Sequence, residues 1–316
     1  MRAFFLSSAA FLVAGAVLIS NASAQAELPA ALDQIAASEL SRQAIPGIAA
    51  VMVKDDHIVW AAGLGVASLE SKLPVTPNTL FQVGSARVFL AAAISELSSQ
   101  GRLQLGTPAG DYLFGLEDKE ARLSAEKLLS PPSEAREEAV AARLIENIRA
   151  RPASAVLQEM IFSPVGMTHT TFAPDLAMTY PLAMGHTAAG KVSRPMEAGG
   201  LFTSANDMAH FLAVFLNGGK VGDILDERQV LPSTVITALS SDSGYGLDAD
   251  ASRGVRLIRQ TSTAPGFASA ILMAPEFHTG VVVLANRDGA SAITIAQKLL
   301  ERSLPVRFPQ SLALAK

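Results

Sequence analysis

The sequence predicts a mixed fold of the α/β (α+β) class, in which one antiparallel sheet is built from strands at both ends of the chain. Two β-rich runs within residues 47–69 are apolar almost throughout, which is typical of strands in a covered sheet. Four more strand-like runs, separated by turn residues, lie within 244–287. The segment between these two groups has helical patterning. We therefore expect a sheet flanked by helices, with an α-rich inserted lobe, in a chain of 316 residues that is long enough to bury a full core.

Residues 1–26 have the composition of a secretory signal peptide. Arg2 supplies a positive charge, an apolar run extends from about Ala9 to Ile19, and small residues suited to cleavage end at Ala24 or Ala26. The alternative is a membrane anchor, but a span needs about 20 apolar residues and this run is shorter. We therefore expect cleavage, secretion across the inner membrane, and a periplasmic or extracellular mature protein with no membrane span. Because the chain has no cysteine, its stability must come from its core.

The rest of the chain, 27–316, is predicted to form a single domain. We expect its sheet lobe in about 27–84 and 240–316, and its helical lobe in about 85–239. The first helix of the domain stops at Pro46-Gly47, because proline cannot continue a helix.

The helix that follows the first strands is expected over Ala86–Gln100. Its alanines make it slim enough to lie in a core, and Gly101 ends it. Further helices are expected within Leu116–Met160, from Ser204 to about Asn217, and over Ala292–Arg302.

Composition argues against several classes of partner. A formal net charge of −4, with no basic run, gives none of the electrostatic features of a nucleic-acid-binding protein. The five histidines do not have the spacing of metal ligands, so we expect no metal site and no cofactor. We expect a monomer.

Five segments occur in an order that resembles the serine β-lactamase and penicillin-binding-protein superfamily. The resemblance covers about Pro46 to Pro305 and is strongest to the class C β-lactamase-related branch of esterases and D-Ala-D-Ala peptidases. It implies the β-lactamase/transpeptidase-like fold, no cofactor, and a small-molecule or peptide ligand such as a β-lactam, a peptidoglycan-like peptide or an ester. The segments are PGIAAVMVKDD, LGVASLESKLPVTPNTLFQVGS, IFSPVGMTHTTF, AGGLFTSANDMAHFLAVFLNGG and APGFASAILMAPEFHTGVVVLANRDG.

The first catalytic motif of that superfamily is Ser-x-x-Lys at the start of a helix, where the amine takes the proton of the hydroxyl. Ser85 matches the serine, which makes it the candidate nucleophile, but Val88 stands where the lysine belongs. Arg87 cannot substitute, because two residues along a helix point about 200° apart and a guanidinium is too weak a base. The alternative role for Ser85 is an ordinary helix N-cap.

The second motif, Tyr-x-Asn or Ser-x-Asn, relays a proton to the leaving group. Its place falls near Ser133-Glu134-Ala135, where neither tyrosine nor asparagine occurs. Ser133 is either a vestige of the hydroxyl or a loop residue after two prolines. The acids Glu134, Glu137 and Glu138 are expected to form a solvated face of a helix.

The third motif, Lys-Thr-Gly or His-Thr-Gly, becomes Gln260-Thr261-Ser262. Only the threonine is kept, and the cation that would bind a substrate carboxylate is lost. The resemblance implies an oxyanion hole formed by the backbone N–H groups of Ser85 and Thr263, which side-chain substitutions leave intact.

Three interpretations remain open. The leading one is an exported, catalytically impaired or inactive hydrolase-like protein that binds a peptide or cell-wall-like ligand without turning it over. The second is an active serine hydrolase (β-lactamase, D-Ala-D-Ala carboxypeptidase or esterase) that uses Ser85 and a base not identified from the sequence. The third is a decayed gene product. Loss of the base weighs most, because general acid–base help contributes about 10²–10⁴ in rate.

Overall fold

A computed structural model describes residues 27–130, 135–187, 192–193, 200–222, 226–241, 245–250 and 254–305. The predicted signal peptide, 1–26, and the predicted second-motif residues Ser133 and Glu134 lie outside the described residues. Among the described residues, no helix is both long and apolar enough to cross a membrane.

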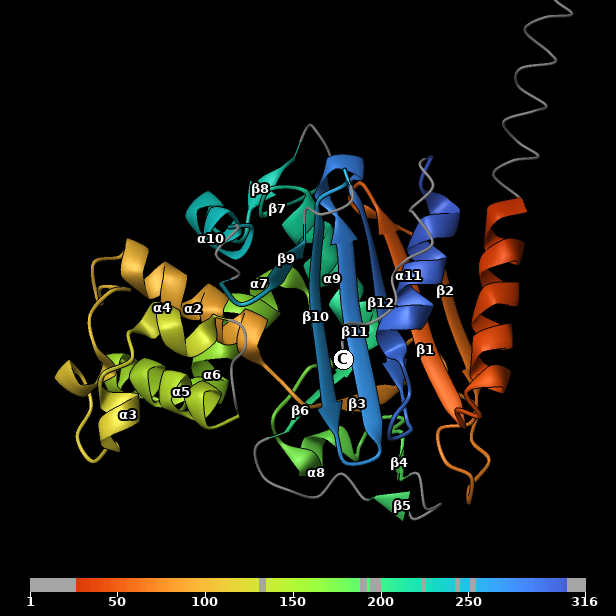
Figure 1. The fold of residues 1–316 in the computed structure, drawn as a ribbon, viewed down its shortest axis with the longest axis horizontal. Helices are drawn as coiled ribbons and strands as arrows, with labels where there is room; N and C mark the ends of the chain where they lie inside the picture. Colours follow the sequence, from red (N-terminus) through yellow and green to blue (C-terminus); the bar gives the residue numbers. More distant parts are fainter. Residues whose placement is uncertain are drawn as a thin grey trace, which may run out of the picture.

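A six-stranded antiparallel sheet forms the centre of the molecule, with the strand order β2-β1-β12-β11-β10-β9 (Figure 1). The N-terminal strands pair with the C-terminal ones through β1 and β12, where Ile48 pairs with Ala285. The predicted sheet built from both ends of the chain is therefore confirmed. Its strands are β1 (Gly47–Lys54), β2 (His57–Gly65), β9 (Asp248–Asp250), β10 (Leu257–Ala264), β11 (Phe267–Ala274) and β12 (Thr279–Ala285).

Both faces of the sheet are covered, which explains why β1 is apolar at successive positions. Its residues alternate between two cores: Ala49 and Val51 belong to one, and Ile48 and Ala50 to the other. Residues 27–42, which are helical, and α11 (Ala292–Ser303) cover the second face. Helix α9 (Ala205–Leu216) packs on the first face, against β1 and β12 (Figure 1).

Helix α9 begins where the sequence predicts. The side chain of Ser204 accepts a hydrogen bond of 3.0 Å from the backbone N–H of Asp207, which caps the helix. Although α9 falls within the segment 85–239, it belongs to the layer that covers the sheet. The helical lobe draws on the chain on both sides of α9, because α10 (Ser233–Leu239) packs against α2 (Arg87–Ser99).

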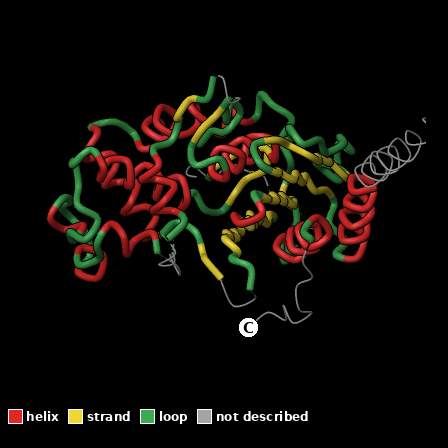
Figure 2. The backbone as a smooth tube through the Cα atoms, turned by 90° about the horizontal axis from the view of Figure 1, so that it is seen from above, coloured by secondary structure: helices red, strands yellow, loops and turns green. Residues whose placement is uncertain are grey.

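That helical lobe lies beside the β9–β10 edge of the sheet, and Figure 2 shows it as a separate group of helices seen from above. Its central member is α2 (Arg87–Ser99), whose alanines Ala91, Ala92 and Ala93 are fully buried, as predicted. Pro152 lies between α5 and α6 and precedes the first residue of α6. The other helices of this group are α3 (Asp118–Ala121), α4 (Ala125–Leu129), α5 (Ala135–Arg149), α6 (Ala153–Leu157), the π-helical turn η2 (Gln158–Phe162) and α7 (Ser163–Val165).

Short elements connect the two parts. Strand β3 leads directly into α2 and pairs with β6, so the start of α2 is held between the helical lobe and the sheet. The remaining short elements of the described residues are β3 (Leu80–Val83), η1 (Ala109–Asp111), α8 (Pro174–Ala177), β4 (Gly185–His186), β5 (Val192–Ser193), β6 (Leu201–Ser204), β7 (Lys220–Val221), β8 (Arg228–Gln229), α10 (Ser233–Leu239) and η3 (Pro275–Phe277).

Candidate active site

Ser85 lies in the short connection between β3 and α2, beside the edge of the sheet. The preceding residue, Gly84, passes so close to β10 that a Cβ there would lie 1.8 Å from the carbonyl oxygen of Thr263. Only glycine allows this approach. The predicted nucleophile is therefore next to the predicted third-motif strand, as the resemblance implies.

The hydroxyl of Ser85 uses its full hydrogen-bonding capacity. It donates to Oε1 of Glu138 over 2.6 Å and accepts from Nε2 of Gln260 over 3.1 Å and from the backbone N–H of Arg87 over 3.2 Å. A hydroxyl has one donor and two acceptor sites. Both lone pairs of the oxygen are therefore engaged, and its proton points at a carboxylate.

The position of Glu138 corrects a prediction made from the sequence. It does not belong to a solvated face: it is half-buried, and its second oxygen accepts a hydrogen bond of 3.1 Å from the backbone N–H of Ala86. Burial raises the pKa of Glu138, while the bonds from Ser85 and Ala86 and the charge of Arg87 oppose that shift without cancelling it. A carboxylate with a raised pKa is a stronger base than an exposed one.

Glu138 was not predicted to be a site residue, because the three motifs of the superfamily contain no glutamate. The sequence position of Glu138 could have identified it as a site residue. Glu138 follows Glu134, at the predicted second motif, by about one helical turn. A helix that brings the second motif to Ser85 therefore also brings the next turn within reach.

The lysine position of the first motif is apolar. Val88 is buried and lies with Ser85 around a small enclosed cavity, where an amine would otherwise stand. The side chain of Arg87 points elsewhere, as expected: its Nε donates to the carbonyl of Gly246 over 3.2 Å, and its Nη2 lies 3.5 Å from Asp248. Among the described residues, no amine, imidazole or phenol is hydrogen-bonded to Ser85.

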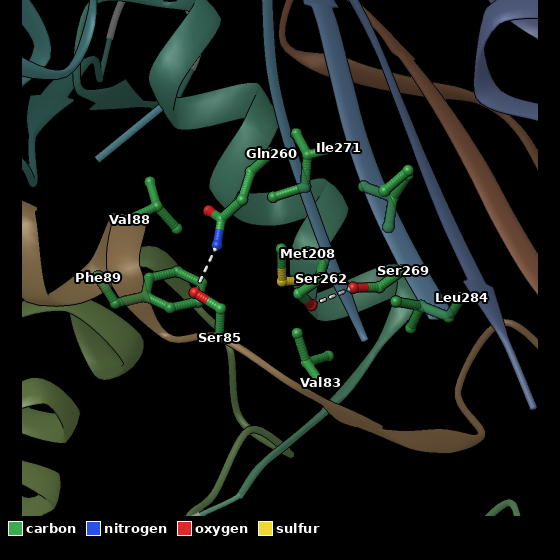
Figure 3. A pocket seen from close by; sticks show the side chains of 12 residues that line it. Val83, Ser85, Val88, Phe89, Met208, Gln260, Ser262, Ser269, Ile271 and Leu284 are labelled. Carbon is green, nitrogen blue, oxygen red and sulfur yellow. Dashed lines mark hydrogen bonds between the residues drawn. The ribbon is translucent and has the colours of Figure 1, made fainter. Parts of the chain in front are cut away.

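The third-motif residues divide between the two faces of β10. Gln260 and Ser262 line the enclosed cavity, where Ser262 shares a hydrogen bond of 2.7 Å with Ser269 (Figure 3). Thr261 and Thr263 are exposed. Gln260 turns its amide nitrogen toward Ser85 (Figure 3), and its buried Oε1 has no hydrogen-bond partner among the described residues. The oxyanion role of Thr263 stays a prediction.

A second, larger pocket opens on the other side of the hydroxyl, toward the helical lobe. It has a volume of about 500 Å³ and is lined by Ser85, Glu138 and mainly apolar side chains of α2, α5 and α6. This volume is within the range of about 300–1,000 Å³ typical of small-molecule sites. The Ser85–Glu138 pair therefore lies on the wall of a pocket that can hold a ligand.

A family model described as "Beta-lactamase" matches residues 32–130 and 121–303 of the chain. The protein therefore belongs to the β-lactamase family, in agreement with its fold and with the position of Ser85.

Curated relatives are distant. The chain is 22% identical to protein flp of Staphylococcus aureus (strain N315), over 81% of this chain but only 62% of that protein's length. It is also 22% identical to a β-lactamase of Pseudomonas fluorescens, over 80% of this chain and 92% of the relative.

Solved structures share the fold. The octameric penicillin-binding protein homologue from Pyrococcus abyssi has a TM-score of 0.74 and 20% identity, over 86% of this chain and 76% of its own. The D-alanine carboxypeptidase AmpC from Burkholderia cenocepacia has a TM-score of 0.67 and 20% identity, over 87% of this chain and 98% of its own. At these identities the likeness concerns the fold alone, and the monomeric state of this chain stays a prediction.

Proposed function

We propose that this protein is an exported serine hydrolase of low catalytic power, in which Ser85 is the nucleophile and Glu138 has replaced the missing lysine as proton acceptor. The observation that carries the proposal is the 2.6 Å hydrogen bond from the Ser85 hydroxyl to Oε1 of Glu138. A nucleophile within hydrogen-bond reach of a base is the arrangement that covalent catalysis requires.

The proton and the acyl group can be followed through the reaction. Glu138 takes the hydroxyl proton while the Ser85 oxygen attacks the acyl carbon, and the collapsing intermediate expels an alcohol that takes the proton back from Glu138. Water, deprotonated by the same carboxylate, then attacks the acyl-serine, and Glu138 returns that proton to the Ser85 oxygen as its bond to the acyl carbon breaks. The products are a carboxylic acid and the restored hydroxyl.

Three features of the site support a low catalytic rate. A carboxylate is a weaker base than the amine it replaces, and Gln260 carries no charge for a substrate carboxylate. In addition, both lone pairs of the Ser85 oxygen accept hydrogen bonds, so one of them must be released before attack.

The same contacts support a second candidate function, ligand binding without turnover. Glu138 bonds both Ser85 and the N–H of Ala86, so it also fastens α5 to the beginning of α2. In that case the carboxylate stabilises the junction of two helices, and the pocket beside it binds a peptide or cell-wall-like ligand without chemistry.

Intact mass spectrometry separates the two functions. Purified protein is incubated with a penicillin, a cephalosporin and p-nitrophenyl acetate. We expect a slowly formed adduct from the ester that is absent in Ser85→Ala and forms about 10²–10⁴ times more slowly in Glu138→Gln. No adduct with any of the three, together with thermal stabilisation by one of them, would establish the binding function instead.

A further inference from the structure

The pocket of about 500 Å³ beside Ser85 is lined mainly by apolar side chains, several of which are small. Its lining includes the alanines Ala135, Ala139, Ala142 and Ala153 and the buried leucines Leu90, Leu157 and Leu201. Alanine side chains leave room that longer ones would fill. The space thus extends away from Ser85 into the helical lobe.

The charges around this pocket are unfavourable to an anion. Among the described residues that line it, the ionisable side chains are Glu138, Arg143 and Glu146. Arg143 already donates to the carbonyl of Phe114 over 3.0 Å, and Glu146 accepts from the N–H of Ala153 over 3.0 Å. With Glu138 ionised, this lining carries one net negative charge, so a ligand carboxylate would meet repulsion.

The Ser85 side of the site gives a ligand carboxylate no cation either. Gln260 takes the place of the third-motif cation, and the guanidinium of Arg87 is held at the carbonyl of Gly246 and near Asp248. β-Lactams and D-Ala-D-Ala peptides both carry a carboxylate near the bond that is cleaved.

We infer that this pocket holds the uncharged apolar acyl chain of a neutral ester, and that the site selects against ligands that carry a carboxylate. The inference rests on the proposed function, since it takes Ser85 as the atom that the acyl group approaches. The apolar side chains of the lining provide the affinity for the acyl chain, and the net negative charge of the lining selects against a carboxylate.

Binding is measured separately from chemistry in Ser85→Ala, which lacks the nucleophile. Isothermal titration compares octanamide with octanoate, which has the same chain but a negative charge, and with hexanamide, which is two methylenes shorter. We expect octanoate to bind at least about tenfold more weakly than octanamide. We expect hexanamide to bind on the order of tenfold more weakly, because each buried methylene contributes about fourfold.

Two matched substitutions locate the site. Ala139 and Ala37 are both exposed alanines in helices, but only Ala139 lines the pocket. In the Ser85→Ala background, Ala139→Leu should weaken octanamide binding about tenfold, and Ala37→Leu should leave it unchanged. Glu146→Gln removes a negative charge and should narrow the difference between octanamide and octanoate.

The outcomes are distinct. Equal affinities for octanamide and octanoate would overturn the selection by charge, and unchanged octanamide binding in Ala139→Leu would overturn the assignment of the pocket. If binding follows the expected pattern but the intact protein forms no Ser85 adduct with neutral p-nitrophenyl esters, the proposed hydrolase fails and the pocket assignment stands. If the Ser85 adduct forms at a rate that does not depend on the length of the acyl chain, the proposed hydrolase stands and the pocket assignment fails.

Discussion

Glu39, in the N-terminal helix, and Glu138, in α5, are both shielded from water, but their neighbours differ. Glu39 accepts hydrogen bonds from Arg42 and Lys298, at 2.5 Å each, and from Gln43 at 3.0 Å. The bonds from Arg42 lower the pKa of Glu39 most, to about 2, with Lys298 and Gln43 adding to them against the effect of burial. Glu138 instead faces a hydroxyl and a backbone N–H, and burial raises its pKa.

The comparison distinguishes two uses of a buried acid. Cations that bond Glu39 hold it ionised, so it joins the N-terminal helix to α11 and has no proton to exchange near neutral pH. At Glu138 the charged form is less favoured, which is what a group that must take up and return a proton requires. The predictions below test this contrast, from the largest expected effect to the smallest.

The largest effect is expected on the chemistry. Glu138→Gln should slow formation of the Ser85 adduct by about 10²–10⁴, because the amide cannot accept the hydroxyl proton. Glu39→Gln, the matched substitution at the other carboxyl, should leave the rate unchanged. Stopped-flow release of p-nitrophenol from a neutral ester measures both. Equal slowing in the two variants would mean that Glu138 acts only through the fold.

The next effect is on stability. Glu39→Gln should lower the free energy of unfolding at pH 7 by about 1–3 kcal/mol, since it removes charge-assisted hydrogen bonds to Arg42 and Lys298. Urea titration followed by circular dichroism measures it. Glu138→Gln should cost less, because at that pH the fold must keep Glu138 charged in a site that disfavours the charge. A larger loss in Glu138→Gln than in Glu39→Gln would contradict the contrast.

The two carboxyls should also give opposite pH dependences. The pKa of Glu39 is lower in the fold than its ordinary 4.5, so its contribution is complete above that value and is lost as the pH falls toward about 2. The pKa of Glu138 is raised, so its contribution falls as the pH rises through that pKa. The unfolding free energy of each Gln variant is subtracted from that of the unsubstituted protein at several acidic pH values. The difference gives the pH dependence of the contribution of each carboxyl to stability.

Adduct formation should follow the same titration of Glu138. Only the ionised carboxylate accepts a proton, so the rate should rise with pH through the raised pKa of Glu138 and then level off. A pH series of p-nitrophenol release tests this. The rising limb should be missing in Glu138→Gln, and its persistence there would point to a different base.

The smallest effects are expected at the cations that bond Glu39. The side chains of Arg42 and Lys298 are 57% and 48% exposed, so each ion pair is largely screened by water. Arg42→Ala and Lys298→Ala should each lower the free energy of unfolding by less than Glu39→Gln does, as measured by urea titration. The double variant should lose more unfolding free energy than either single variant, because Glu39 then loses both cations.

Local pattern was sufficient for the fold. The strands β1 and β12 could be predicted because a covered strand is apolar at every position, and the helix α9 because Ser204 and Asp207 mark its start. These signals lie within a few residues of the elements they define. The order of the strands within the sheet was not predicted, because it depends on pairing between segments far apart in the chain.

The site could be predicted only in part. Ser85 and Gln260 follow from motifs that keep their place in the sequence, although the bond between them does not. Glu138 is 53 residues from Ser85, and the packing of α5 across α2 brings them together. That packing is a tertiary property, and a helix face rich in acids is more often solvated than bound to a hydroxyl.

The pairing of β1 with β12 also governs how the chain can be made. When β1 and β2 have been synthesised, β12 has not. β12 is the strand that pairs with the other edge of β1, where Ile48 lies opposite Ala285. Until then one edge of a strongly apolar strand is unpaired, a state that favours association with other chains. The unpaired edge of β1 is therefore open to association with other chains until residues 279–285 have been made.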